Sequence, residues 1–160
     1  MDAYTTTPWA PAFTAIAGSS AALTGLLFVA LSINLAQVLK GEGLVSRSVE
    51  VLVLLTAVLV ASTLLLMPDQ AAGTAAVEVL FVALVTEGFL GYIHVRAPKS
   101  RRMFASRVFG SHLGPVFLLV GGVSLLFQNG GGLYWVVPGM LAAMVAAIIG
   151  AWVLLVEILR

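Results

Sequence analysis

Few residues of this chain could do chemistry, and three of them lie inside long apolar runs. Glu87 sits near the middle of the run from Thr74 to Val95, His94 follows near the end of that run, and His112 lies about one turn into a later run. An isolated charge at the middle of a bilayer costs about 3 kcal/mol or more, so a carboxyl group there must be protonated, paired or facing a polar cavity. Buried carboxylates and histidines exchange protons in ion and proton pathways. The pattern therefore predicts Glu87 as the charged element of a membrane pathway.

A second set of candidate residues lies in the first apolar run. Gly18, Gly25 and Ser32 recur every seven residues, so they share one helix face, and Asn34 adds a polar amide nearby. Small residues let a neighbouring helix approach closely, which favours helix packing. The same face could instead line a water-filled pathway, because Ser32 and Asn34 are more polar than packing requires.

These residues could also form one cluster with the ionisable groups. A site made of Glu87, His94, His112, Asn34 and Ser32 is geometrically possible if the helices pack suitably. The structural alternative is a protonated Glu87 that hydrogen-bonds a neighbouring helix, a contact worth about 1 kcal/mol. Each histidine could likewise be an interface residue with one satisfied nitrogen. Both interpretations remain open from the sequence.

The composition explains why the surroundings of Glu87 should be apolar. Hydrophobic residues make up 61% and charged residues 9% of the 160 residues, against about 45–50% and about 25% in soluble domains. A helical span needs about 20 residues, so the chain has room for five spans and no separate soluble domain. We expect an all-α, polytopic integral membrane protein with one transmembrane domain in the cell membrane. The expected spans are 13–39, 48–67, 74–95, 108–128 and 133–159.

The positions of the charges predict an orientation. With five spans, all eight Lys and Arg residues fall on the side that also holds the C-terminus. The positive-inside rule then places the N-terminus outside and the C-terminus in the cytoplasm. One cytoplasmic loop carries most of these charges, and we expect it to set the topology, to bind acidic lipid headgroups or to dock a membrane protein partner. Its basic residues are Arg96, Lys99, Arg101, Arg102 and Arg107.

Several residues receive purely structural interpretations. Pro8 and Pro11 should keep the N-terminal segment from being helical. Ser46 or Ser48 is a candidate cap of the second span, and Glu50 in its first turn would complement the helix dipole. Glu78 is interpreted in the same way in the third span.

The last run contains the strongest helix-packing signal. Small residues recur there every four positions and form a ridge along one helix face. We expect no cofactor and no metal, because there is no cysteine and the two histidines match no common metal-binding motif. Enzymatic activity and nucleic-acid binding are not expected either. The ridge consists of Gly139, Ala143, Ala147 and Ala151.

The sequence favours one function and leaves one alternative. The favoured function is a self-associating membrane protein, a homo-oligomer in the lipid bilayer, that forms a channel-like pathway for an ion or small solute. The alternative is a non-conducting scaffold or regulatory subunit, docked on a larger membrane complex through the ridge of the last span and the basic loop. The two differ in whether Glu87 faces a hydrated cavity or a dry helix contact.

Overall fold

The computed structural model describes residues 2–41, 43–96 and 101–158. Within these ranges all regular secondary structure is helical. A short 3-10 turn, η1 (Thr7–Trp9), leads into the first helix, and a short helix, α2 (Leu35–Lys40), follows it. The five long helices are α1 (Ala10–Ile33), α3 (Leu44–Leu64), α4 (Ala72–Arg96), α5 (Arg101–Phe127) and α6 (Leu133–Ile158).

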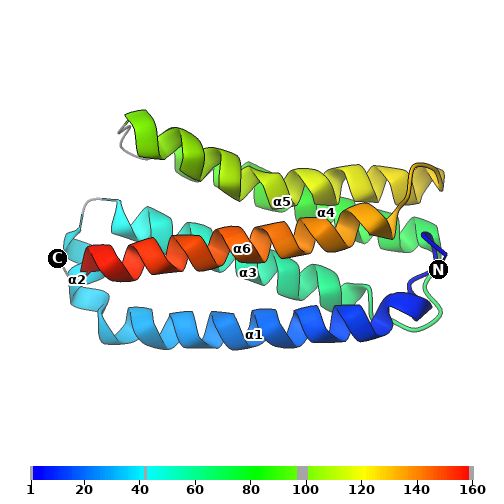
Figure 1. Cartoon of the computed structure of the whole chain (residues 1–160), viewed down its shortest axis with the longest axis horizontal. Helices are drawn as coiled ribbons and strands as arrows, with labels where there is room; N and C mark the ends of the chain where they lie inside the picture. The colour runs from blue at the N-terminus through cyan, green and yellow to red at the C-terminus, as the bar shows by residue number, and fades with distance from the viewer. Residues whose placement is uncertain (1, 42, 97–100, 159–160) are drawn as a thin grey trace.

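The long helices lie along one common axis, and the N-terminal residues and the end of α6 are at opposite ends of the bundle (Figure 1). We call the end at which α6 finishes the C-terminal end. Helix α3 is central and contacts α1, α4 and α6, whereas α5 packs on α4 and α6. Helix α1 packs mainly against α3 and lies at the edge of the bundle. Residues from α3, α4 and α5 can therefore meet inside the bundle.

Both the core and the outer surface of the bundle are apolar. Leu54, Leu90 and Leu125 are at most 1% exposed, whereas Ile33 and Val95 on the outside are 77% and 80% exposed. Soluble monomers rarely expose large contiguous apolar patches. All five long helices have the length and the apolar composition to cross a bilayer. The prediction of an all-helical chain with five such helices is confirmed.

The predicted first span differs from the helices in the structure. The chain was expected to be helical from 13 to 39, but α1 ends at Ile33 and α2 starts after Asn34. The Asn34 amide donates to the carbonyl of Ala30 at 2.9 Å and so bonds the last turn of α1. The prolines do not prevent helix formation, because Pro8 lies in η1 and Pro11 in the first turn of α1. A helix start tolerates proline, since its missing N–H has no partner there.

Three other helices begin earlier than predicted. Helix α3 starts at Leu44 instead of Ser48, α4 at Ala72 instead of Thr74, and α5 at Arg101 instead of position 108. The earlier starts put Glu50 and Glu78 in the second turns of their helices, and neither α3 nor α4 has an acidic residue in its first turn. The predicted dipole role of both carboxylates is wrong, because it depended on a first-turn position.

Candidate functional site

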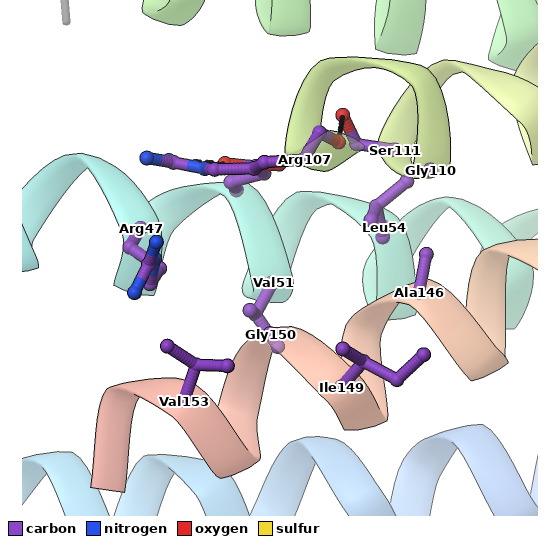
Figure 2. A pocket seen from close by; sticks show the side chains of 11 residues that line it. Arg47, Val51, Leu54, Arg107, Gly110, Ser111, Ala146, Ile149, Gly150 and Val153 are labelled. Atoms are coloured by element: carbon purple, nitrogen blue, oxygen red, sulfur yellow. Dashed lines mark hydrogen bonds and ion pairs between the residues drawn. The ribbon is translucent and has the colours of Figure 1, made fainter. Parts of the chain in front are cut away.

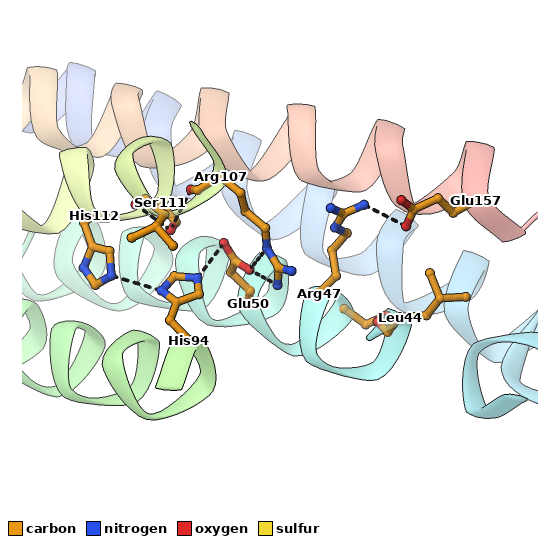
Figure 3. A network of polar contacts seen from close by, with 10 residues as sticks. Leu44, Arg47, Glu50, His94, Arg107, Ser111, His112 and Glu157 are labelled. Carbon is orange, nitrogen blue, oxygen red and sulfur yellow. Dashed lines mark hydrogen bonds and ion pairs between the residues drawn. The ribbon is translucent and has the colours of Figure 1, made fainter. Parts of the chain in front are cut away.

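Five ionisable side chains form a continuous row inside the bundle. We call this row the carboxylate–histidine chain; its order is Glu87, His112, His94, Glu50 and Arg107. Glu87 Oε2 lies 2.5 Å from His112 Nδ1, and His112 Nε2 lies 3.1 Å from His94 Nδ1. His94 Nε2 lies 3.4 Å from Glu50 Oε1, and Arg107 Nε donates to Glu50 Oε2 at 2.6 Å. Figure 3 shows the four groups from His112 to Arg107 side by side.

Three helices supply these groups. Glu87 and His94 come from α4, where a spacing of seven residues places them on the same face two turns apart. His112 and Arg107 come from α5, and Glu50 comes from α3. The contacts within the carboxylate–histidine chain therefore depend on how α4 packs against α5 and α3.

Glu50 and Arg107 form a largely buried ion pair. Their side chains are 6% and 18% exposed, and Arg107 Nη2 also lies in ion-pair contact with Glu50 Oε2. Sequence reasoning missed this pair for two reasons. Glu50 was interpreted as a residue of the helix start, and Arg107 was assigned to a loop, whereas it lies in α5. One signal was available, because Glu50 is flanked by Val49 and Val51 and thus interrupts an apolar run.

Glu87 is at the other end of the carboxylate–histidine chain, and only one of its two carboxylate oxygens has a hydrogen-bond partner in the part of the protein that the structure describes. Its Oε1 atom is buried and has no hydrogen-bond partner among the described residues. Its side chain is 21% exposed and that of His112 is 25% exposed, so the pair reaches the outer surface of the bundle. On the same face of α4, Leu84 is 60% exposed and a Cβ atom at Gly91 would meet nothing within 4 Å. The surface beside Glu87 is therefore open.

A cavity of about 340 Å³ adjoins the Glu50 end of the chain. It lies between α3, α5 and α6, and both Glu50 and Arg107 line it. Figure 2 shows Arg47 and Arg107 on one side and Ile149 and Val153 on the other. At about 30 Å³ per molecule it has room for about ten waters. The buried chain thus has a cavity at one end and Glu87 at the other.

The polar residues of α1 are not part of this site. Ser32 is exposed, and its hydroxyl donates to the carbonyl of Phe28 in the same helix at 2.8 Å. Asn34 bonds its own helix end, as described above. Gly18 and Gly25 are exposed, and a Cβ atom at either would meet nothing within 4 Å. The structure therefore brings Glu87, His94 and His112 together without Ser32 and Asn34, because this face of α1 points away from the bundle.

The small residues of α6 pack against other helices inside the bundle. A Cβ atom at Gly139 would lie 3.0 Å from the carbonyl oxygen of Gly114 in α5. Ala143 and Ala147 are at most 1% exposed, and Ala151 is half-buried against the core. The ridge holds α6 against its neighbours, so most of it is not available to a partner protein.

The predicted basic loop is shorter than expected. Arg96 is the last residue of α4 and its guanidinium lies 4.5 Å from the centre of the Tyr92 ring. Lys99 lies outside the described residues, and Arg101 and Arg102 belong to the first turn of α5. Arg107 belongs to the carboxylate–histidine chain.

The geometry suits proton exchange better than metal binding. Among the described residues, no three side chains of His, Asp or Glu converge on one point as metal ligands. The four titratable groups instead follow one another along a line, so each histidine can share a proton with a neighbour on either side and each carboxylate with one histidine. Comparison of the chain with protein-family models, with curated proteins and with solved structures finds no significant match.

Proposed function

We propose that this protein is an integral membrane protein, that it carries protons along the carboxylate–histidine chain, and that it works as a homo-oligomer. The observation that carries the proposal is the row of contacts from Glu87 to Glu50, whose separations are 2.5, 3.1 and 3.4 Å. Membrane segments rarely contain ionisable residues, and those that pair with one another mark ion and proton routes. The apolar outer surface supports placement in a bilayer. No enzymatic step is part of the proposal.

The proton route follows from the chemistry of neutral imidazole, which has one N–H donor and one acceptor nitrogen. In a first arrangement Glu87 is ionised, and Nδ1–H of His112 donates to it. His112 Nε2 then accepts from Nδ1–H of His94, and His94 Nε2 accepts from a protonated Glu50. In a second arrangement every donor and acceptor along the row is exchanged, so that Glu87 holds the proton and Glu50 is ionised.

Conversion between the two arrangements moves one unit of positive charge from Glu50 to Glu87. Three protons each move by one link: from Glu50 to His94, from His94 to His112, and from His112 to Glu87. The second arrangement keeps the ion pair of Glu50 with Arg107. The longest link is the 3.4 Å separation of His94 and Glu50; it must shorten by a few tenths of an ångström to reach the ordinary range of about 2.7–3.2 Å. We expect this link to limit transfer.

The exposure of the Glu87–His112 pair is the reason for proposing several copies. Glu87 lies three residues past the middle of α4, which is about 4.5 Å at 1.5 Å per residue. The next ionisable residue of α4 in the other direction is Glu78, which pairs with Gln70 and lies about 13.5 Å from Glu87 along the helix. One copy therefore supplies a route through about half the thickness. A second copy against the open surface beside Glu87 would bury the Glu87–His112 pair between helices.

The proposed orientation retains the positive-inside argument. It puts the C-terminal end, with the 340 Å³ cavity, in the cytoplasm. Protons would then enter or leave the cytoplasmic half through this cavity and pass Glu50.

Proton flux in liposomes tests the proposal. The purified chain is reconstituted with a pH-sensitive dye inside, and a potassium diffusion potential drives the flux. Glu87→Gln and His112→Phe should each reduce the flux at least about tenfold, because each removes an acid–base group from the route. Glu78→Gln is the matched control: it neutralises another glutamate of α4 that is not in the chain, and it should leave the flux within about twofold.

The same measurement distinguishes the alternative. The scaffold or regulatory-subunit function is supported by the exposed face of α1, with Gly18, Gly25 and Ser32, which is available to another membrane protein. Folded protein without proton flux above that of empty liposomes would refute the proton route and leave this alternative. Equal flux in wild type, Glu87→Gln and His112→Phe would also refute it.

A further inference from the structure

The cavity between α3, α5 and α6 carries an excess of positive charge. Among its lining residues Arg47 and Arg107 are basic and Glu50 is acidic, so the lining has a net charge of +1. Glu157 pairs with Arg47 but does not line the cavity, and its side chain is 39% exposed. We propose that this cavity binds the phosphate headgroup of an anionic phospholipid. The site shares Glu50 and Arg107 with the proposed proton route, and it includes only Arg107 of the residues of the predicted basic loop.

Both arginines retain donors for such a group. A guanidinium has five N–H donors, and Arg47 uses Nη1 for Glu157 at 2.7 Å. Arg107 directs Nε and Nη2 at Glu50 and makes no contact through Nη1 among the described residues. Arginine binds phosphate oxygens through paired N–H groups. The cavity therefore contains donors that a phosphate would satisfy.

Small side chains create the space for the headgroup. A Cβ atom at Gly110 would meet nothing within 4 Å, so this side of α5 is open. Ala146 and Gly150 line the cavity from α6. Its 340 Å³ is near the lower end of the range of about 300–1,000 Å³ for small-molecule pockets. The space suits a phosphate with its glycerol, whereas whole acyl chains would have to lie outside.

The walls of the cavity favour a lipid over a soluble anion. Ile149 lines the cavity and is also 59% exposed on the outer surface, so the cavity is continuous with the apolar exterior. Val51, Leu54 and Val153 supply the remaining apolar wall. The first turns of α5 lie apart from α3 and α6 at the C-terminal end (Figure 1). A headgroup can thus lie in the cavity while its acyl chains follow α6 in the bilayer, as in basic pockets between membrane helices.

Binding is measured on the full chain in neutral detergent, from the rise in unfolding temperature on addition of ligand. The probes are a short-chain phosphatidylglycerol, a short-chain phosphatidylcholine and inorganic phosphate. Phosphatidylglycerol should bind, and Gly110→Leu and Arg47→Gln should each weaken it about tenfold or more, the first by filling the cavity and the second by removing a charged donor. Gly18→Leu is the matched control at an open glycine outside the cavity and should change the affinity less than about twofold.

The probes also separate the sources of the anion. If inorganic phosphate binds as tightly as phosphatidylglycerol and responds to the same variants, the anion site stands but its ligand is free phosphate, and the lipid assignment is overturned. Phosphatidylcholine that binds as tightly as phosphatidylglycerol refutes recognition of an anionic headgroup. The site is refuted if phosphatidylglycerol does not bind, or if it binds equally to wild type and Arg47→Gln. Arg47→Gln also keeps the test valid if Gly110→Leu does not fold.

Discussion

The burial of the Glu50–Arg107 pair predicts a strong energetic coupling between the two residues. Arg107→Gln leaves the Glu50 carboxylate, whose side chain is 6% exposed, without its cation. Removing one partner of a buried ion pair costs about 3–5 kcal/mol. Because Arg107 is still 18% exposed, we expect the lower end of that range, about 3 kcal/mol. Glu50→Gln should cost less, since the freed guanidinium can turn toward the cavity.

A double-mutant cycle isolates the interaction. The free energy of unfolding is measured for the wild type, Arg107→Gln, Glu50→Gln and the double variant in mixed detergent micelles. The double variant should cost about 2 kcal/mol less than the sum of the two single variants, which is the coupling energy. The control cycle is Arg47 with Glu157, whose carboxylate is 39% exposed. Exposed pairs contribute about 1 kcal/mol or less.

The comparison of the two cycles can refute the reasoning. Equal coupling energies for the buried and the exposed pair would show that burial does not set the strength of these contacts. A cost below about 1 kcal/mol for Arg107→Gln would show that Glu50 does not depend on its cation.

Three further predictions concern packing, hydrogen bonding and pH. Gly114→Ala should lower the free energy of unfolding by about 1–3 kcal/mol, because its Cβ would lie 2.7 Å from the backbone nitrogen of Ala143; thermal unfolding checks this against Gly25→Ala, a site with open space that should not be destabilised. Ser20→Ala should cost about 1 kcal/mol, since the buried Ser20 hydroxyl donates across helices to the carbonyl of Leu55 at 2.7 Å; a cost no greater than that of Ser32→Ala, whose hydroxyl bonds only its own helix, would contradict it. The Thr5 hydroxyl, and after it the Tyr4 N–H, lower the pKa of Asp2 by hydrogen bonds; the stability that Asp2 contributes is therefore present above its ordinary pKa and is lost as pH falls through the lowered value. An NMR titration should show that Thr5→Ala raises the pKa of Asp2, and an unchanged pKa would exclude the hydroxyl as the main cause.

The sequence alone determined the class of fold, and it marked part of the candidate site. Five long helices could be predicted because length and apolar composition are local properties of each run. Glu87, His94 and His112 stood out because ionisable groups in apolar runs are costly. The small residues of α6 could also be recognised, because their four-residue spacing places them on one helix face regardless of which helix packs there.

Only the tertiary structure decided how these groups are connected. Glu50 resembled a residue of a helix start and Arg107 a residue of a loop, yet packing of α3 against α4 and α5 makes them one end of the carboxylate–histidine chain. The same packing leaves Ser32 on the outside of the bundle. The rotation and register of each helix depend on close approaches between distant segments, such as that of Gly114 to Ala143. A side chain's partner across helices follows from those approaches, so no local pattern in the sequence could reveal it.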